Sequence, residues 1–157
     1  DGFILEKVLK EDYDPTFVAG VKLSNDPVTN LGTKVVKHIS IKPNTADKDA
    51  IMGMIKILKD GENLVLFPEG TRSRTGSMIE AKKGVILVAR MSKANKEGDM
   101  SQEKWNNAVV NVNIGEPVII PKKDKEESKH DYDERCLNYL MKSIAKGLPE
   151  KYRGVYK

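Results

Sequence analysis

Apolar and polar residues along this chain follow two different periods, which alternate from one segment to the next. Apolar side chains three or four positions apart predict helices, whereas short runs of apolar and β-branched residues predict strands. The helical period predicts helices at residues 2–10, 26 to about 37, 51–58, 81–92 and 128–148. The short apolar runs predict strands at residues 16–21, 38–42, 63–67, 109–114 and 118–120.

Start and stop signals support several of these helices. Asp26-Pro27 is a good helix start, Asn44 or Thr45 is expected to cap the helix that carries Ile51 to Leu58, and Pro149 stops the last helix. Strands that alternate with helices need crossover connections, which indicate a parallel sheet. We therefore expect an α/β fold with a single domain over residues 1–157, in which helices cover both faces of a largely parallel mixed sheet, with 63–67 as its interior strand.

Composition sets limits on function. The chain has 157 residues with a net charge of +4, and Cys136 is its one cysteine, so the sequence predicts neither a disulfide framework nor a metal centre. No apolar run approaches the length of a membrane span, and no signal peptide is visible. The excess of Lys and Arg serves solubility or attracts anionic lipid headgroups. Because these residues are not interleaved with aromatics, we expect no nucleic-acid partner.

The most informative segment begins at Leu64, where an apolar run leads into Pro-Glu-Gly-Thr-Arg-Ser at residues 68–73. A buried strand that ends in a tight polar loop is a usual ligand site in α/β proteins. Arg72 and Arg74 carry planar, permanently charged guanidinium groups that suit phosphate. Glu69 can fix the geometry of these cations, or Glu69 and Arg72 can form a purely structural ion pair.

Residues 67–73 read Phe-Pro-Glu-Gly-Thr-Arg-Ser and match, at every position, the phosphate-binding motif of the glycerolipid acyltransferases, which the chain resembles from about Asp1 to Pro121. The resemblance implies a glycerol-3-phosphate acyltransferase-like fold. It also implies transfer of a fatty acyl group from acyl-CoA or acyl carrier protein to the hydroxyl of lysophosphatidate, in phospholipid biosynthesis. No bound cofactor is expected. The lipid substrates imply a membrane-associated protein on the cytoplasmic face.

The resemblance also suggests roles for individual residues. Arg72 is the first choice for binding the substrate phosphate. Glu69 and Thr71 would orient Arg72 or contact the glycerol. Gly70 would let the backbone come close to the substrate. A second family motif has an Arg where this chain has Pro43, so the adjacent Lys42 could supply the charge. Lys42 is equally well explained as a surface lysine at a strand end.

The family's catalytic motif is Asn-His, four residues, then Asp, and residues 1–5 resemble its end. Asp1 would be the carboxylate that orients the catalytic His, and it could also cap the first helix. We therefore expect that the sequence begins inside this motif and that the His lies upstream. His38 on a strand is expected to be structural, and His130 to be solvated. A strand of the family is also not found near residues 94–95. Either this protein lacks that strand or a segment is absent there, and we favour an absent segment.

Other functions stay open at this point. The acceptor could be glycerol 3-phosphate or another lysophospholipid. Alternatively, the chain could be a non-catalytic lipid- or phosphate-binding module that kept the Arg72 loop and lost the His. Lys82 and Lys83, after this loop, are either a solvated pair or a contact to the lipid surface.

Overall fold

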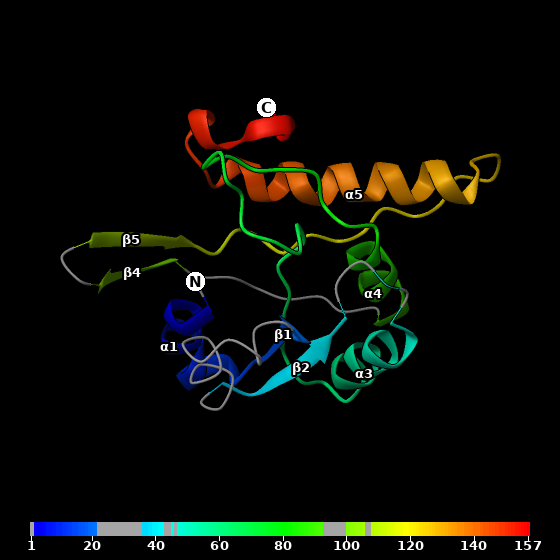
Figure 1. Cartoon of the computed structure of the whole chain (residues 1–157). Helices are drawn as coiled ribbons and strands as arrows, with labels where there is room; N and C mark the ends of the chain where they lie inside the picture. The colour runs from blue at the N-terminus through cyan, green and yellow to red at the C-terminus, as the bar shows by residue number, and fades with distance from the viewer. Residues whose placement is uncertain (1, 22–35, 43–44, 46, 93–99, 106–107) are drawn as a thin grey trace. The chain divides into compact units, whose positions relative to one another are not determined.

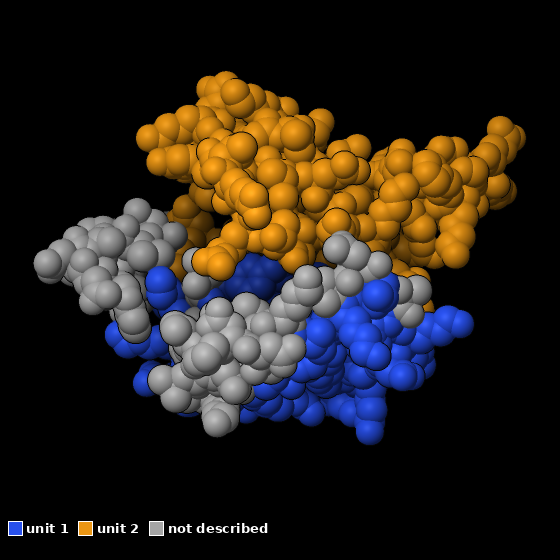
Figure 2. Space-filling view, viewed as in Figure 1, with its two compact units in different colours: residues 1–67, 102–110 blue, residues 68–101, 111–157 orange. Residues whose placement is uncertain are grey.

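The computed structural model describes residues 2–21, 36–42, 45, 47–92, 100–105 and 108–157, and Figure 1 shows their helices and strands. The chain has two compact units, coloured separately in Figure 2, of which the first comprises residues 1–67 with 102–110 and the second 68–101 with 111–157. Each unit has buried apolar side chains of its own. The expectation of a single domain over residues 1–157 stays a prediction.

The first unit contains a small parallel sheet, which confirms the predicted α/β class. Its strands are β1 (Thr16–Gly20), β2 (His38–Ile41) and β3 (Leu64–Val65), in the order β2-β1-β3. Both pairings are parallel, with Phe17 opposite His38 on one side and Val65 on the other. The carboxyl ends of the strands therefore lie at the same edge, as expected from crossover connections.

The prediction of an interior strand at residues 63–67 was wrong. Only Leu64 and Val65 join the ladder, β1 occupies the middle of the described sheet, and Phe67 is 40% exposed. Pro68 gives a physical reason, because proline has no N–H to donate and favours the end of a strand. The apolar run was correctly interpreted as a strand, but the length of this strand and its place in the sheet were predicted wrongly.

Two helices belong to the first unit, α1 (Gly2–Tyr13) and α3 (Lys48–Lys59), and both confirm predicted helices. On α3, Met54 and Ile55 are almost fully buried, as the helical period predicted. The helix cap differs from the prediction: Asp47, not Asn44 or Thr45, accepts a hydrogen bond from the N–H of Ala50 at 3.2 Å. The carboxylate of Asp47 also accepts the N–H of Lys42 at 3.0 Å, and these bonds lower the pKa of Asp47.

The second unit contains α4 (Gly84–Ser92) and α5 (Lys129–Lys146). The start of α5 confirms the prediction, because Ser128 caps it by accepting the N–H of Asp131 at 3.1 Å. Buried side chains of α5 form one face and pack against the segment after β3 and the end of the chain. This cluster comprises Met78, Ala81, Ile86, Tyr132, Cys136, Leu137, Met141, Ala145 and Tyr156.

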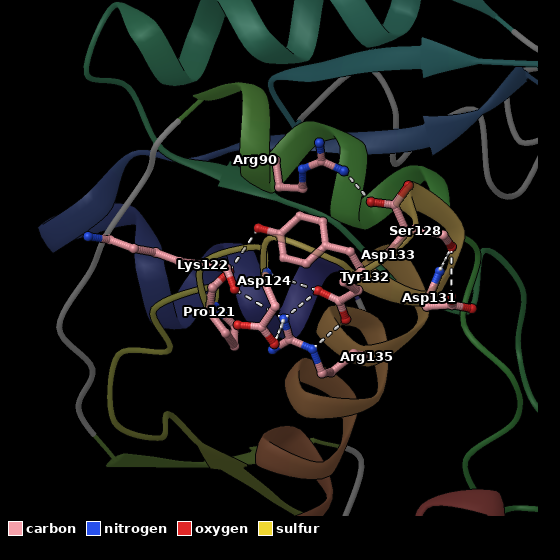
Figure 3. Close-up of polar contacts among 10 residues, drawn as sticks. Arg90, Pro121, Lys122, Asp124, Ser128, Asp131, Tyr132, Asp133 and Arg135 are labelled. Atoms are coloured by element: carbon pink, nitrogen blue, oxygen red, sulfur yellow. Dashed lines mark hydrogen bonds and ion pairs between the residues drawn. The ribbon is translucent and has the colours of Figure 1, made fainter.

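Tyr132 fixes the beginning of α5 to α4 and to the preceding segment (Figure 3). Its hydroxyl donates to the carbonyl of Pro121 at 2.8 Å, and the guanidinium carbons of Arg90 and Arg135 lie 4.8 and 5.5 Å from its ring centroid. Arg90 is also paired with Asp133. These contacts join α4 to α5 through one aromatic ring and its charged neighbours.

Other elements differ from the predictions. The predicted strand at 118–120 is absent from the structure, because Pro117 and Pro121 on its two sides cannot donate to a ladder. A two-stranded sheet consists of β4 (Met100–Trp105), which was not predicted, and β5 (Ala108–Asn113), which was. Most of the predicted helix at 26–37 lies outside the described residues, and its last two positions are not helical. Residues 94–95 also lie outside them.

Two short 3-10 helices end the chain, η2 (Glu150–Tyr152) and η3 (Gly154–Tyr156). Neither was predicted, although Pro149 was correctly expected to stop α5. Both belong to the second unit. We call them together the C-terminal turns.

The buried face of α3 provides a direct test of the first unit. Met54 is 1% exposed, whereas Met52 on the same helix is 58% exposed. Met54→Ala should lower the free energy of unfolding by about 2–5 kcal/mol, because it leaves a cavity. Met52→Ala should change it by no more than about 0.5 kcal/mol. Urea denaturation followed by circular dichroism measures both, and equal losses would contradict this packing.

Candidate functional site

Four of the predicted site residues, Glu69 to Arg72, lie on one irregular loop of the second unit, residues 68–82, which we call the motif loop. The N–H of Lys82 donates to the carbonyl of Pro68 at 2.8 Å and so closes the base of the loop. Gly70 and Gly76 have φ angles of +66° and +72°, a region that favours glycine. A Cβ at Gly70 would lie 3.4 Å from Cγ of Lys82, so the Lys82 stem passes close to this turn.

Glu69 is partly buried at the beginning of the motif loop. Its carboxylate accepts a hydrogen bond from the backbone N–H of Ile79, which lies near the other end of the loop. Burial raises the pKa of Glu69, and the hydrogen bond from Ile79 partly opposes this shift. The backbone of its own loop therefore stabilises the charged form of the carboxylate.

Arg72 has a different environment from Glu69. Its side chain is exposed, and it has neither a hydrogen bond nor an ion pair with the residues that the structure describes. The alternative of a purely structural Glu69–Arg72 ion pair was therefore wrong. The suggestion that Glu69 fixes the guanidinium directly is also not seen. Among the described residues, nothing competes with a ligand for the N–H donors of Arg72.

The residues around Arg72 are also polar and accessible. Thr71 and Arg74 are exposed. The hydroxyl of Ser73 accepts the N–H of Thr75 at 3.2 Å, and the two hydroxyl oxygens lie 3.1 Å apart. This local turn fixes the chain direction just after Arg72 without using its guanidinium group.

The remaining predicted site residues lie elsewhere. Lys42 follows β2 in the first unit, with its N–H bonded to Asp47 and its carbonyl accepting the hydroxyl of Thr45 at 2.9 Å. Its side chain is exposed. Asp1 lies outside the described residues. The structure thus brings Glu69, Gly70, Thr71 and Arg72 together on one loop, whereas the site roles of Lys42 and Asp1 stay predictions.

The two histidines have the environments expected from the sequence. Nδ1 of His38 lies 3.0 Å from the carbonyl oxygen of Val36, a local structural contact at the start of β2. His130 is exposed at the start of α5, where Nε2 lies 3.1 Å from Nζ of Lys83. Lys83 also pairs with Glu134 at 3.2 Å on this surface.

Sequence reasoning missed the contacts that the C-terminal turns make with the motif loop. The N–H of Met78 donates to the carbonyl of Tyr152 at 2.9 Å, and the N–H of Ala81 donates to the hydroxyl of Tyr156 at 2.9 Å. The hydroxyl of Ser77 donates to the carbonyl of Lys151 at 3.1 Å. No motif in the last residues indicated these contacts.

Two further observations concern ligands and membranes. Among the described residues, no group of three or more His, Cys, Asp and Glu side chains is arranged to hold a metal ion. Within the same part of the chain, the helices are too short or too polar to cross a membrane.

A protein-family model matches most of this chain. The family model described as Acyltransferase matches residues 1–112. The match includes the parallel sheet and the motif loop, but it excludes α5 and the C-terminal turns. No solved structure matches the chain.

The raised pKa of Glu69 predicts a pH-dependent contribution to stability. The folded protein holds the Glu69 proton more tightly than the unfolded chain, so its contribution to stability falls as pH rises from the ordinary value of 4.5 through the raised pKa. Glu69→Gln keeps a carbonyl acceptor for Ile79 but no longer titrates. The free energy of unfolding of this variant, relative to the natural protein, should therefore increase between about pH 4 and about pH 7.

Urea denaturation at both pH values measures this difference. Glu80→Gln is the matched control, because it removes the same charge from an exposed position on the same loop. An increase of equal size in both variants would show that net charge, rather than burial of Glu69, is responsible.

Proposed function

The chain belongs to the acyltransferase family, and we propose that its acceptor is lysophosphatidate, which it converts to phosphatidate in phospholipid biosynthesis. The phosphate-binding motif at residues 67–73 supports a phosphorylated acceptor. The observation that carries the proposal is the state of Arg72, whose guanidinium group is exposed and unpaired among the residues that the structure describes. A planar fork with its donors unused suits a phosphate group.

The geometry of the motif loop supports this assignment of Arg72. A charge-assisted contact gains most when the donor does not first have to leave another partner. Glu69, the nearest acid in the sequence, is held by the Ile79 N–H instead. Glu69 and Thr71 would then orient the acceptor or contact its glycerol, and Gly70 would allow close approach of the backbone.

The proposed reaction joins the acceptor hydroxyl to an acyl thioester. The hydroxyl oxygen bonds to the thioester carbonyl carbon, the carbon–sulfur bond breaks, and the hydroxyl proton passes through a general base to the leaving thiolate. A histidine suits the base, and a carboxylate that holds its far nitrogen stabilises the imidazolium. We assign Asp1 to that carboxylate, as the Asp of the family's catalytic motif.

The remaining partners follow from the substrates. The acyl donor would be acyl-CoA or acyl carrier protein, and the reaction needs no resident cofactor. Both the acceptor and the product are membrane lipids, so we propose association with the cytoplasmic face of a membrane. The net charge of +4 is consistent with attraction to anionic headgroups. Lys42 would add a further positive charge near the acceptor.

Replacing Arg72 tests the phosphate assignment. Arg72→Ala in the full-length protein should raise the KM for lysophosphatidate roughly ten- to hundredfold, the equivalent of a lost charged hydrogen bond. The KM for the acyl thioester should change little. Arg72→Lys should recover only part of the loss, because an ammonium group cannot form the bidentate contact.

Arg74→Ala is the control, because it removes an equal charge from the same exposed loop but lies outside the matched motif. Equal effects of both variants would indicate general electrostatics rather than a defined phosphate site. Measuring acyl transfer to glycerol 3-phosphate as well as to lysophosphatidate shows which of these two candidate acceptors the protein uses. Binding of lysophosphatidate without any acyl transfer would favour a non-catalytic module.

A further inference from the structure

The motif loop has little regular structure of its own, yet part of it is buried. Met78 and Ala81 are 8% and 5% exposed and belong to the core cluster of the second unit. Buried backbone groups need hydrogen-bond partners, and an irregular loop cannot supply all of them. For Met78 and Ala81, the partners come from the C-terminal turns.

Gly154 makes the closest contact between the two segments. Its φ is +54°, and a Cβ there would lie 1.9 Å from the carbonyl oxygen of Met78 and 2.9 Å from its nitrogen. Side chains never approach a backbone this closely, so only glycine fits. The N–H of Val155 donates to the same carbonyl at 3.4 Å. The turn at Gly154 is thus built against the backbone of Met78.

Tyr156 holds the other end of the same stretch. Its ring is 7% exposed, and its hydroxyl accepts the N–H of Ala81 at 2.9 Å. Ala81 is followed by Lys82, whose N–H closes the loop onto Pro68. The C-terminal turns are also joined to the segment that directly follows α5, because Nε of Arg153 donates to the carbonyl of Leu148 at 2.9 Å.

Ile79 connects this contact to the site. It lies between Met78 and Ala81, both of which are bonded to the C-terminal turns, and its own N–H donates to the carboxylate of Glu69. The direction of that N–H depends on the backbone at Met78. A change in the turns would therefore reach Glu69 through residues 78–81.

We propose that Tyr156 and Gly154 are positioning residues, which hold the backbone of residues 78–81 and thereby keep the motif loop in the geometry that binds the phosphorylated acceptor. This inference rests on the proposed function for its substrate. It extends the acceptor site to a part of the chain that lies beyond residues 1–112, which the family model matches. The acceptor site is then completed by residues more than seventy positions away in the sequence.

Tyr156→Phe is the most selective test, because it removes the hydroxyl and leaves the buried ring. Tyr152→Phe is the matched control, since Tyr152 is 43% exposed and its ring stays available to Lys151. Hydrogen exchange followed by NMR should show faster exchange of the Ala81 and Ile79 amides in Tyr156→Phe only. Unchanged exchange at Ile79 would overturn the proposal.

Binding of a short-chain lysophosphatidate, measured by titration calorimetry below its micelle concentration, tests the consequence. Tyr156→Phe should weaken it several-fold, and Gly154→Ala should weaken it further or prevent folding, while Tyr152→Phe binds normally. Normal binding by folded Tyr156→Phe would show that the turns serve stability alone, and would overturn the proposal.

The two proposals fail in distinguishable ways. If lysophosphatidate does not bind the natural protein or Arg72→Ala has no effect, the proposed acceptor is wrong. Amide exchange at Ile79 needs no ligand, so it still decides whether the turns hold the backbone of residues 78–81.

Discussion

The requirement that buried backbone groups be hydrogen-bonded determines the shape of the motif loop. Helices and strands meet this requirement internally, but residues 77–81 cannot, because they form neither. The N–H groups of Met78 and Ala81 donate instead to the Tyr152 carbonyl and the Tyr156 hydroxyl, both from the C-terminal turns. The positions of α5, of the turns and of the loop therefore depend on one another, and Tyr156 takes part both in the core and in a backbone hydrogen bond.

Glu69 and Arg72, the two charged residues of the motif, have different physical roles. Glu69 is partly desolvated, which raises its pKa, while the backbone N–H of Ile79 stabilises its charged form. Arg72 is exposed and unpaired within the described residues, so its charge is available but its position is not fixed by a partner. A ligand phosphate would supply the partner that Arg72 lacks. This arrangement differs from a structural ion pair, in which each charge would have satisfied the other.

Features that depend on nearby residues could be predicted from the sequence. The apolar period of α5 and its stop before Pro149 both act within a few residues, and the structure confirms them. The edge position of β3 could not be predicted, because it depends on which strands pair with it. The cap of α3 was placed on Asn44 or Thr45, although Asp47 reaches both Ala50 and Lys42. Which of several neighbouring polar residues caps a helix is decided by the geometry of the folded chain. The capping propensity of a residue carries no information about that geometry.

The candidate site shows the same division between local and distant information. A short motif was enough to suggest phosphate binding at Arg72, because a guanidinium group is chemically suited to phosphate. The motif did not indicate what holds its loop, since Gly154 and Tyr156 are common residues whose roles arise only from contact with Met78 and Ala81. A match to residues 67–73 therefore identifies the charged groups, whereas their geometry depends on a segment that the match does not include. The charged groups of this loop are neighbours in the sequence, whereas the residues that we propose position them, Gly154 and Tyr156, are distant.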